Sequence, residues 1–156
     1  MRVLLVLATC GAIGAAVYFI EHGPRPGIAL DDRIGAVSYG EPLSQVEAAV
    51  GPGKKHRVSR YPDRFVSYFP RAGIYVSYPG ETIYTRSSRY KTDSGIGVGS
   101  TLSQLRHRIS VHCDLGPNSY CEHDPADHGD FFTVTQFDID RATKRVVAVT
   151  IEEGVP

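Results

Sequence analysis

One seven-residue phrase occurs twice in this 156-residue chain. The first copy is Gly-Glu-Pro-Leu-Ser-Gln-Val at positions 40–46, and the second is Gly-Ser-Thr-Leu-Ser-Gln-Leu at positions 99–105. In each copy the apolar residues continue at helical spacing, and a stretch rich in Tyr, Val and Thr follows. Similar phrases that return along a chain are typical of repeated packing units. The phrase therefore predicts two units, each a short helix followed by a group of strands.

In the first unit, a helix is expected over Pro42–Val50. Proline is favoured in a first helical turn, and the Gly-Pro-Gly at 51–53 ends the pattern. Turn-forming residues then divide the chain into short β-branched and aromatic runs, and their close spacing favours antiparallel hairpins. The strands expected are Arg57–Tyr61, Phe65–Phe69, Ile74–Tyr78 and Ile83–Ser87.

In the second unit, a helix is expected from Thr101 to about Ser110. Thr101 is followed three residues later by Gln104, which is the spacing of a capping box at a helix N-terminus. Two strands are expected near the end of the chain, Phe131–Ile139 and Arg145–Ile151.

This order of elements predicts an α+β fold class. Neither helix is long enough to be stable alone, so each is expected to pack its apolar stripe on the strands. The predicted architecture is two tandem units of a short helix followed by an antiparallel β-meander, with the helices packed on one face of the sheet and one N-terminal membrane helix before them. The predicted divisions are a signal-anchor or transmembrane segment at 1–22, a Pro/Gly linker at 23–33, a first unit at 34–94 and a second unit at 95–156.

The N-terminal segment carries no charge from Val3 to Ile20 and follows Arg2. A helix of this length is roughly 27 Å long, close to the apolar thickness of a bilayer. A retained anchor formed by residues 3–20 is favoured, because the apolar run continues past the small residues at 14–16 that suit signal cleavage. Cleavage as an export signal and lipidation of Cys10 are the alternatives. In each case the rest of the chain is expected outside the cytoplasm, membrane-anchored or secreted.

Cys113 and Cys121 are the only cysteines outside that segment. The turn-forming residues 116–118 can fold the chain back between them, and an oxidising compartment favours a disulfide. The alternative is a zinc site that adds His112 and His123 to two thiolates. Its spacing matches no strong motif, so no metal ligand and no cofactor are predicted.

Charge is divided along the chain although 17 basic residues balance 17 acidic ones. Residues 54–91 hold nine Lys or Arg and two Asp or Glu, whereas residues 110–156 hold three and nine. The chain is therefore expected to be an electric dipole that steers a charged partner, unless the two halves neutralise each other within the fold. The acidic segment 124–130 is interpreted as a solvated loop, since it lacks the ligand alternation of a calcium loop.

The basic stretch also holds six of the nine tyrosines. Alternation along a strand places Tyr75 opposite to Ile74 and Val76, and it places Tyr84 and Arg86 on one face of the next strand. Aromatic and arginine side chains on an uncovered sheet face dominate the energetics of many protein interfaces. The alternative is that most of these rings are edges of the core. The binding residues predicted are Tyr75, Tyr84, Arg86, Tyr61 and Arg60.

The two phrases resemble a known repeat. A Gly-x-x-Leu-Ser-Gln-(Val/Leu) helix opening followed by a β-meander, present twice, is similar to the tandem helix–strand units of two families. These are the secreted β-lactamase inhibitor proteins and the small lipoprotein of the outer-membrane barrel assembly machinery. The resemblance covers roughly residues 34–153. In the inhibitor family a concave, aromatic-rich sheet face grips an enzyme, so the resemblance implies a docking role for the tyrosine-bearing strands and transfers no individual contact residue.

Catalytic motifs are missing from the sequence. Residues 95–101 place three glycines before a helix, as phosphate-binding loops do, but without the lysine and spacing of a P-loop. Neither a GxSxG nor an HExxH pattern occurs. The chain is therefore predicted not to be an enzyme, with a hydrolase of unrecognised mechanism as the alternative.

Together these features predict an extracytoplasmic, membrane-tethered binding or assembly module. Its Tyr/Arg-rich sheet face is expected to dock an unknown protein or an anionic envelope component, and residues 3–20 are expected to bind the membrane. Nucleic acid is not expected at such an address, although arginine and tyrosine interleave as on strand-binding surfaces. The alternative function is an inhibitor or accessory factor of an exported hydrolase.

Overall fold

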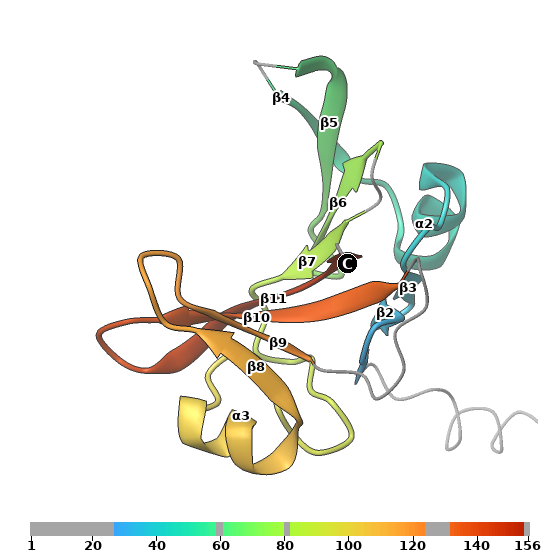
Figure 1. Ribbon diagram of the computed structural model, residues 1–156. Helices are drawn as coiled ribbons and strands as arrows, with labels where there is room; N and C mark the ends of the chain where they lie inside the picture. The colour runs from blue at the N-terminus through green and yellow to red at the C-terminus, as the bar shows by residue number, and fades with distance from the viewer. Residues whose placement is uncertain (1–26, 59–60, 80–81, 124–131, 155–156) are drawn as a thin grey trace, which may run out of the picture.

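The described part of the chain is mostly antiparallel β-structure (Figure 1). The computed structural model describes residues 27–58, 61–79, 82–123 and 132–154. Its helices are α2 (Leu43–Val50) and α3 (Leu102–Arg108). Its strands are β1 (Ile28–Ala29), β2 (Arg33–Ile34), β3 (Val37–Ser38), β4 (Lys54–Val58), β5 (Tyr61–Phe69), β6 (Ile74–Tyr78), β7 (Ile83–Thr85), β8 (Val111–Asp114), β9 (Tyr120–His123), β10 (Thr133–Asp140) and β11 (Arg145–Glu153).

One eight-stranded sheet contains strands from both halves of the chain. Its order is β4-β5-β6-β7-β11-β10-β9-β8, and every neighbouring pair is antiparallel. The halves meet where β7 pairs with β11, with Tyr84 opposite Thr150 and Ile83 opposite Ile151. Figure 1 shows a strong twist, so that β5 and β6 run in a clearly different direction from β10 and β11.

A smaller sheet of order β1-β2-β3 shares one core cluster with the large sheet. Asp31, in the turn between β1 and β2, connects the two sheets. Its backbone N–H donates to Thr135 Oγ1 at 2.6 Å, and its carboxylate accepts from the Thr135 N–H at 2.7 Å. Asp31 holds a positive φ of 59°, a conformation that aspartate tolerates better than most residues. These bonds bring the smaller sheet over β10.

The core lies on one face of the large sheet, because buried and half-buried residues alternate along the strands. In β6, Ile74, Val76 and Tyr78 are buried, while Tyr75 and Ser77 are half-buried on the other face. The alternation predicted for this strand is confirmed. The core cluster continues through residues of the smaller sheet, both helices and the second half of the large sheet, among them Val37, Val46, Phe69, Leu105, Phe137 and Ile151.

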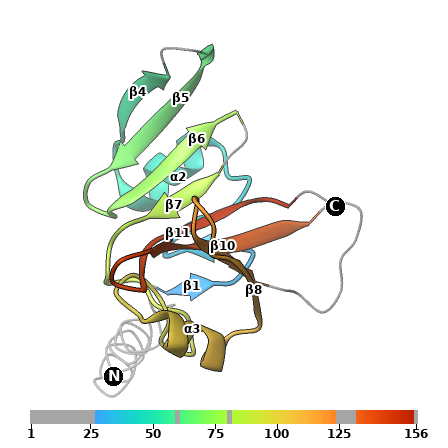
Figure 2. The same ribbon diagram turned by 60° about the vertical axis from the view of Figure 1, so that its left-hand side comes forward.

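The predicted α+β fold class, with two helix–meander units and helices packed on one face of the sheet, is wrong. The described residues form antiparallel sheets of three and eight strands with only two short helices. Each helix buries a single residue, Val46 in α2 and Leu105 in α3. Figure 2 shows α2 behind β6 and β7, whereas α3 lies near one end of the sheet. Helices of eight and seven residues are too short to form a covering layer, and Ile34 and Val37 of the smaller sheet share that role.

Predictions of individual helices and strands agreed with the structure better than the predicted fold class did. The helix before Gly51 ends where expected, and the capping box of Thr101 and Gln104 is confirmed. Strands β5, β6, β7, β10 and β11 overlap their predicted ranges, but β4 begins at Lys54 rather than at Arg57. Strands β8 and β9, which flank the cysteine loop, were not predicted. Residues 28–29 and 33, within the segment predicted as linker, form parts of β1 and β2.

Candidate functional site

Three tyrosines stack in a row across the face of the large sheet that is turned away from the core. Tyr68 of β5 pairs in register with Tyr75 of β6, which pairs with Tyr84 of β7. Ring centroids are 4.5 Å apart for Tyr68 and Tyr75 and 4.4 Å apart for Tyr75 and Tyr84. Residues directly opposite one another in an antiparallel pair project from the same face, so register alone brings the rings together. We call this set the aromatic row, and the face that carries it the open face.

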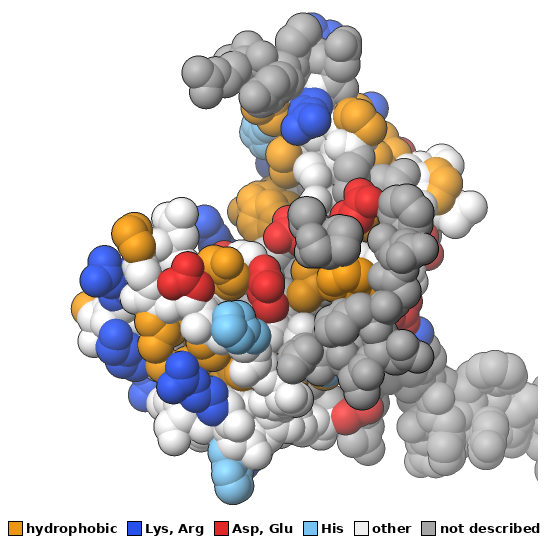
Figure 3. All heavy atoms as spheres, viewed as in Figure 1, with side chains coloured by type: hydrophobic (Ala, Val, Ile, Leu, Met, Phe, Trp, Pro, Cys, Tyr) orange, Lys and Arg blue, Asp and Glu red, His pale blue; other side chains and the backbone are white. Residues whose placement is uncertain are grey.

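Arginine side chains border the aromatic row. Arg86 and Arg89 are exposed, and with Tyr68 and Tyr75 they line a hollow of about 300 Å³. Arg89 is held in place, since its guanidinium donates to the Arg71 carbonyl at 2.8 Å. In Figure 3 the outline of the molecule is hollowed between the part with β4 and β5 and the part with β8–β11, and hydrophobic side chains lie at its inner end. Stacked rings beside guanidinium groups form a surface suited to an anionic or aromatic partner group.

The aromatic row is partly withdrawn from water. Burial raises the pKa of the Tyr84 hydroxyl, and the neighbouring Tyr75 raises it further, while Arg86 acts in the opposite direction. The Tyr84 hydroxyl therefore stays protonated at neutral pH and can donate a hydrogen bond. Arg86 provides positive charge next to it.

The second half of the open face is acidic. Thr150 of β11 lies opposite Tyr84, Gln136 of β10 lies opposite Thr150, and Glu122 of β9 lies opposite Gln136. Asp138 and Glu152 lie two positions from Gln136 and Thr150 on the same strands and so share this face. We call Glu122, Asp138 and Glu152 the acidic group. Burial raises the pKa of Glu152, and repulsion from Glu122 and Asp138 raises it further.

The structure brings together three of the five predicted binding residues. Tyr75, Tyr84 and Arg86 lie on the open face. Tyr61 begins β5, where only its backbone is described, and Arg60 lies outside the described residues.

Tyr68, Arg89 and the acidic group were not predicted to belong to the same face as Tyr75 and Tyr84. The β5–β6 hairpin offers a signal for Tyr68: Phe69 pairs with Ile74 across the turn, so Tyr68 falls opposite Tyr75. No local pattern relates the acidic group to the aromatic row, because the two sets meet only through the β7–β11 pairing.

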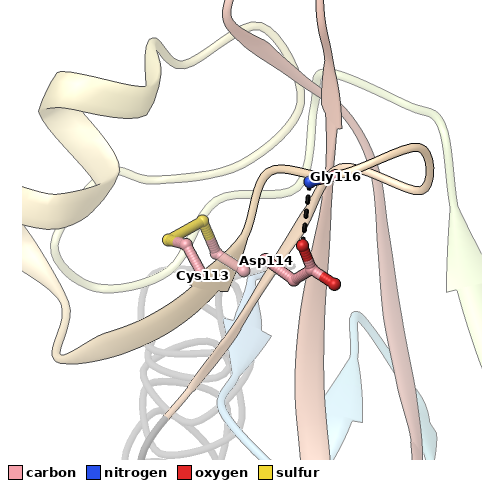
Figure 4. The surroundings of a disulfide bond; sticks show 4 residues. Cys113, Asp114 and Gly116 are labelled. Atoms are coloured by element: carbon pink, nitrogen blue, oxygen red, sulfur yellow. Dashed lines mark hydrogen bonds between the residues drawn. A yellow bond between two sulfur atoms is a disulfide. The ribbon is translucent and has the colours of Figure 1, made fainter.

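The predicted disulfide between Cys113 and Cys121 is confirmed (Figure 4). The two residues pair in register across β8 and β9. In the turn that follows, the Asp114 carboxylate accepts a hydrogen bond from the Gly116 N–H at 2.8 Å. The alternative zinc site is wrong, because both sulfur atoms are in the disulfide and neither is a thiolate.

A second group of polar side chains connects the smaller sheet to β9. The His123 imidazole contacts the Asp31 carboxylate, with 2.5 Å between Nδ1 and Oδ2. His123 also lines a hollow of about 490 Å³ together with Thr92, Ser94 and Arg108. A histidine held by a carboxylate is also the arrangement of the oriented base in a hydrolase, which keeps the predicted hydrolase alternative open. The evident role of this pair is to join β9 to the β1–β2 turn.

The described residues were compared with the predictions on metal binding and on membrane insertion. Among the described residues, no group of three or more His, Cys, Asp or Glu side chains is placed to hold a metal ion. No helix within those ranges is long and apolar enough to cross a bilayer. The predicted membrane segment, residues 3–20, and the acidic segment 124–130 lie outside the described residues.

The fold and the open face define an antiparallel β protein whose large sheet has an aromatic, basic half and an acidic half. Comparisons with protein-family models, curated proteins and solved structures found no match to this chain. The resemblance to the inhibitor and lipoprotein families therefore stays a prediction.

Proposed function

We propose that this chain is a non-catalytic binding or assembly module, tethered to a membrane outside the cytoplasm, whose open face docks a protein or a polyanion. The aromatic row beside Arg86 and Arg89 supports the proposal. Stacked Tyr75 and Tyr84 are rigid and half-buried, so they present apolar area at little cost in side-chain entropy. Aromatic and arginine residues around a hollow are the composition typical of interface hot spots.

The membrane tether is the part of the proposal that rests on sequence. The uncharged segment 3–20 supports it. The confirmed Cys113–Cys121 disulfide supports an oxidising address, since structural disulfides are rare in reducing compartments. A tethered domain meets envelope partners at high local concentration, so a moderate affinity at the open face suffices.

A pull-down from native envelope extract tests the docking face. The full chain is immobilised as wild type, as the triple variant Tyr75→Ala, Tyr84→Ala and Arg86→Ala, and as the control Arg141→Ala. Arg141 is an exposed arginine in the turn between β10 and β11, outside the strands and not among the residues that line the hollow of the aromatic row. We expect the triple variant to lose captured partners by at least about tenfold, as loss of two or more hot-spot residues implies. The control retains them.

Two further measurements complete this test. Far-UV circular dichroism and thermal unfolding establish that the triple variant is folded. Capture that is equal for wild type and the folded triple variant contradicts the proposal. Titration of the wild type against a panel of exported hydrolases addresses the inhibitor function: inhibition that is lost in the triple variant assigns the open face to that role.

A further inference from the structure

The open face carries opposite charges on its two halves. On the β4–β7 half, the charged residues beside the aromatic row are Lys54, which pairs with Tyr68, and Arg86. The β8–β11 half carries the acidic group. A polyanion lying across the whole face is repelled by one half of it. A protein surface that carries the same two charges in the reverse order is attracted by both.

A second copy of this chain is such a surface. We propose that two copies associate through their open faces, related by a two-fold axis that runs parallel to the strands at the β7–β11 junction. This inference rests on the proposed function, because it names the partner of the same face. Four strands lie on each side of the junction, so the rotation places β7 over β11, β6 over β10, β5 over β9 and β4 over β8 of the other copy.

The sheet is strongly twisted (Figure 1), and a half-turn about an axis parallel to its strands carries a twisted surface onto one that twists in the same sense. Eight strands at about 4.8 Å spacing and a strand length of about 17 Å give a projected face on the order of 600 Å² per copy. Standard interfaces bury about 800 Å² of accessible surface on each partner. We therefore expect a dimer of moderate affinity.

The register predicts which charges meet. Thr85 pairs with Val149 and Asp138 pairs with Ala148, so Arg86 and Asp138 lie at the same level along the strands. After the rotation, Arg86 of one copy lies one strand, about 4.8 Å, to the side of Asp138 of the other, across facing sheets that pack about 10 Å apart. The arginine and aspartate side chains together span that separation.

The same geometry relates a second charge pair. Lys54 lies at the level of the aromatic row through its pairing with Tyr68. Glu122 lies at that level on β9. After the rotation these two residues are also offset by one strand. Each pair occurs twice in the dimer by symmetry.

Charge exchange tests this arrangement on the full chain in mild detergent. Sedimentation velocity measures association, and native mass spectrometry identifies each species by mass. We expect wild type to dimerise, and Arg86→Asp and Asp138→Arg each to weaken self-association by at least about tenfold, because each places like charges in both contacts. An equimolar mixture of the two variants restores a dimer, now as the heterodimer. The double variant with both substitutions restores the homodimer.

One variant serves as a control, and two further variants provide an independent second test. Arg141→Asp changes an exposed arginine in the turn between β10 and β11, outside the strands and both proposed charge pairs, and is expected to leave the dimer intact. The Lys54→Glu and Glu122→Lys variants repeat the exchange at the second pair. They keep the design informative if Asp138→Arg fails to fold, because the Asp138 carboxylate also accepts a hydrogen bond from Gln136 at 2.6 Å.

The outcomes separate this inference from the proposed function. A monomeric wild type at about 100 µM, or variant mixtures with no excess of heterodimer, overturns the dimer. If envelope capture still depends on Tyr75, Tyr84 and Arg86, the docking function stands and the partner is a different molecule. If neither assay responds to open-face substitutions, both proposals are wrong.

Discussion

Among single residues, Glu152 shows how the open face combines burial with like charge. Its side chain is half-buried, and Glu122 and Asp138 lie close enough to raise its pKa above the ordinary value of 4.5. The folded state therefore binds the Glu152 proton more tightly than the unfolded state does. Stability from this site is highest at low pH, and it falls as the pH rises through the window between 4.5 and the raised folded pKa.

Glu152→Gln removes the charge that the folded state disfavours. We expect the variant to match wild type at about pH 4, where Glu152 is protonated, and to have the higher melting temperature at about pH 7. Thermal unfolding across this range measures the difference. Glu153→Gln, a neighbouring exposed carboxylate, is the control and leaves the pH profile unchanged. A Glu152→Gln effect of the same size at both pH values contradicts this account.

At the scale of elements, β8 depends on a covalent link. Among the described strands it lies at the edge of the large sheet next to β9, and Cys113–Cys121 joins the two strands across a separation of eight residues. Cys121 is buried in the core, and Cys113 packs against it from β8. The disulfide restricts the unfolded chain and also holds the edge strand on the core.

Replacing both cysteines with serine is expected to lower the free energy of unfolding by about 2–3 kcal/mol, the value typical of a short disulfide loop. Hydrogen exchange is expected to accelerate most in β8 and β9, whose pairing the disulfide holds, and least in β4, at the opposite edge of the sheet. Chemical denaturation of the variant, and of wild type with and without reductant, measures the effect. Equal stability in all three samples contradicts the prediction.

For the whole molecule, the β7–β11 pairing decides whether the two halves fold as one body. Ile83 and Ile151 are fully buried opposite each other at this junction and belong to one core cluster with residues from both halves. A shared core of this kind favours cooperative unfolding of a single domain.

Ile151→Ala tests that cooperativity. Truncating a fully buried isoleucine is expected to cost about 2–5 kcal/mol. Hydrogen exchange is expected to accelerate in β5 and β6 as well as in β9 and β10, because both sets rest on the same junction. Val147→Ala, on an exposed β11 side chain, is the control. Loss of protection in only one half indicates two independently stable units, as the predicted division at residues 94 and 95 implies.

Several features of the fold were readable from neighbouring residues. The capping box of Thr101 and Gln104, the end of α2 at Val50, the alternation in β6 and the Cys113–Cys121 link each depend on groups within about ten positions. For the open face, the same alternation grouped Tyr84 with Arg86. Spacing and turn chemistry act over such distances, so sequence alone determined them.

The tertiary structure decided the rest. Pairing of Tyr84 with Thr150, contact of Asp31 with Thr135, and the meeting of the aromatic row with the acidic group join segments that share no local pattern. Those contacts join strands from both halves of the chain into one large sheet. They also place basic and acidic side chains on the same face of that sheet. The physical reason is that strand pairing between distant segments is selected by the burial of a common core, which no short stretch of sequence encodes.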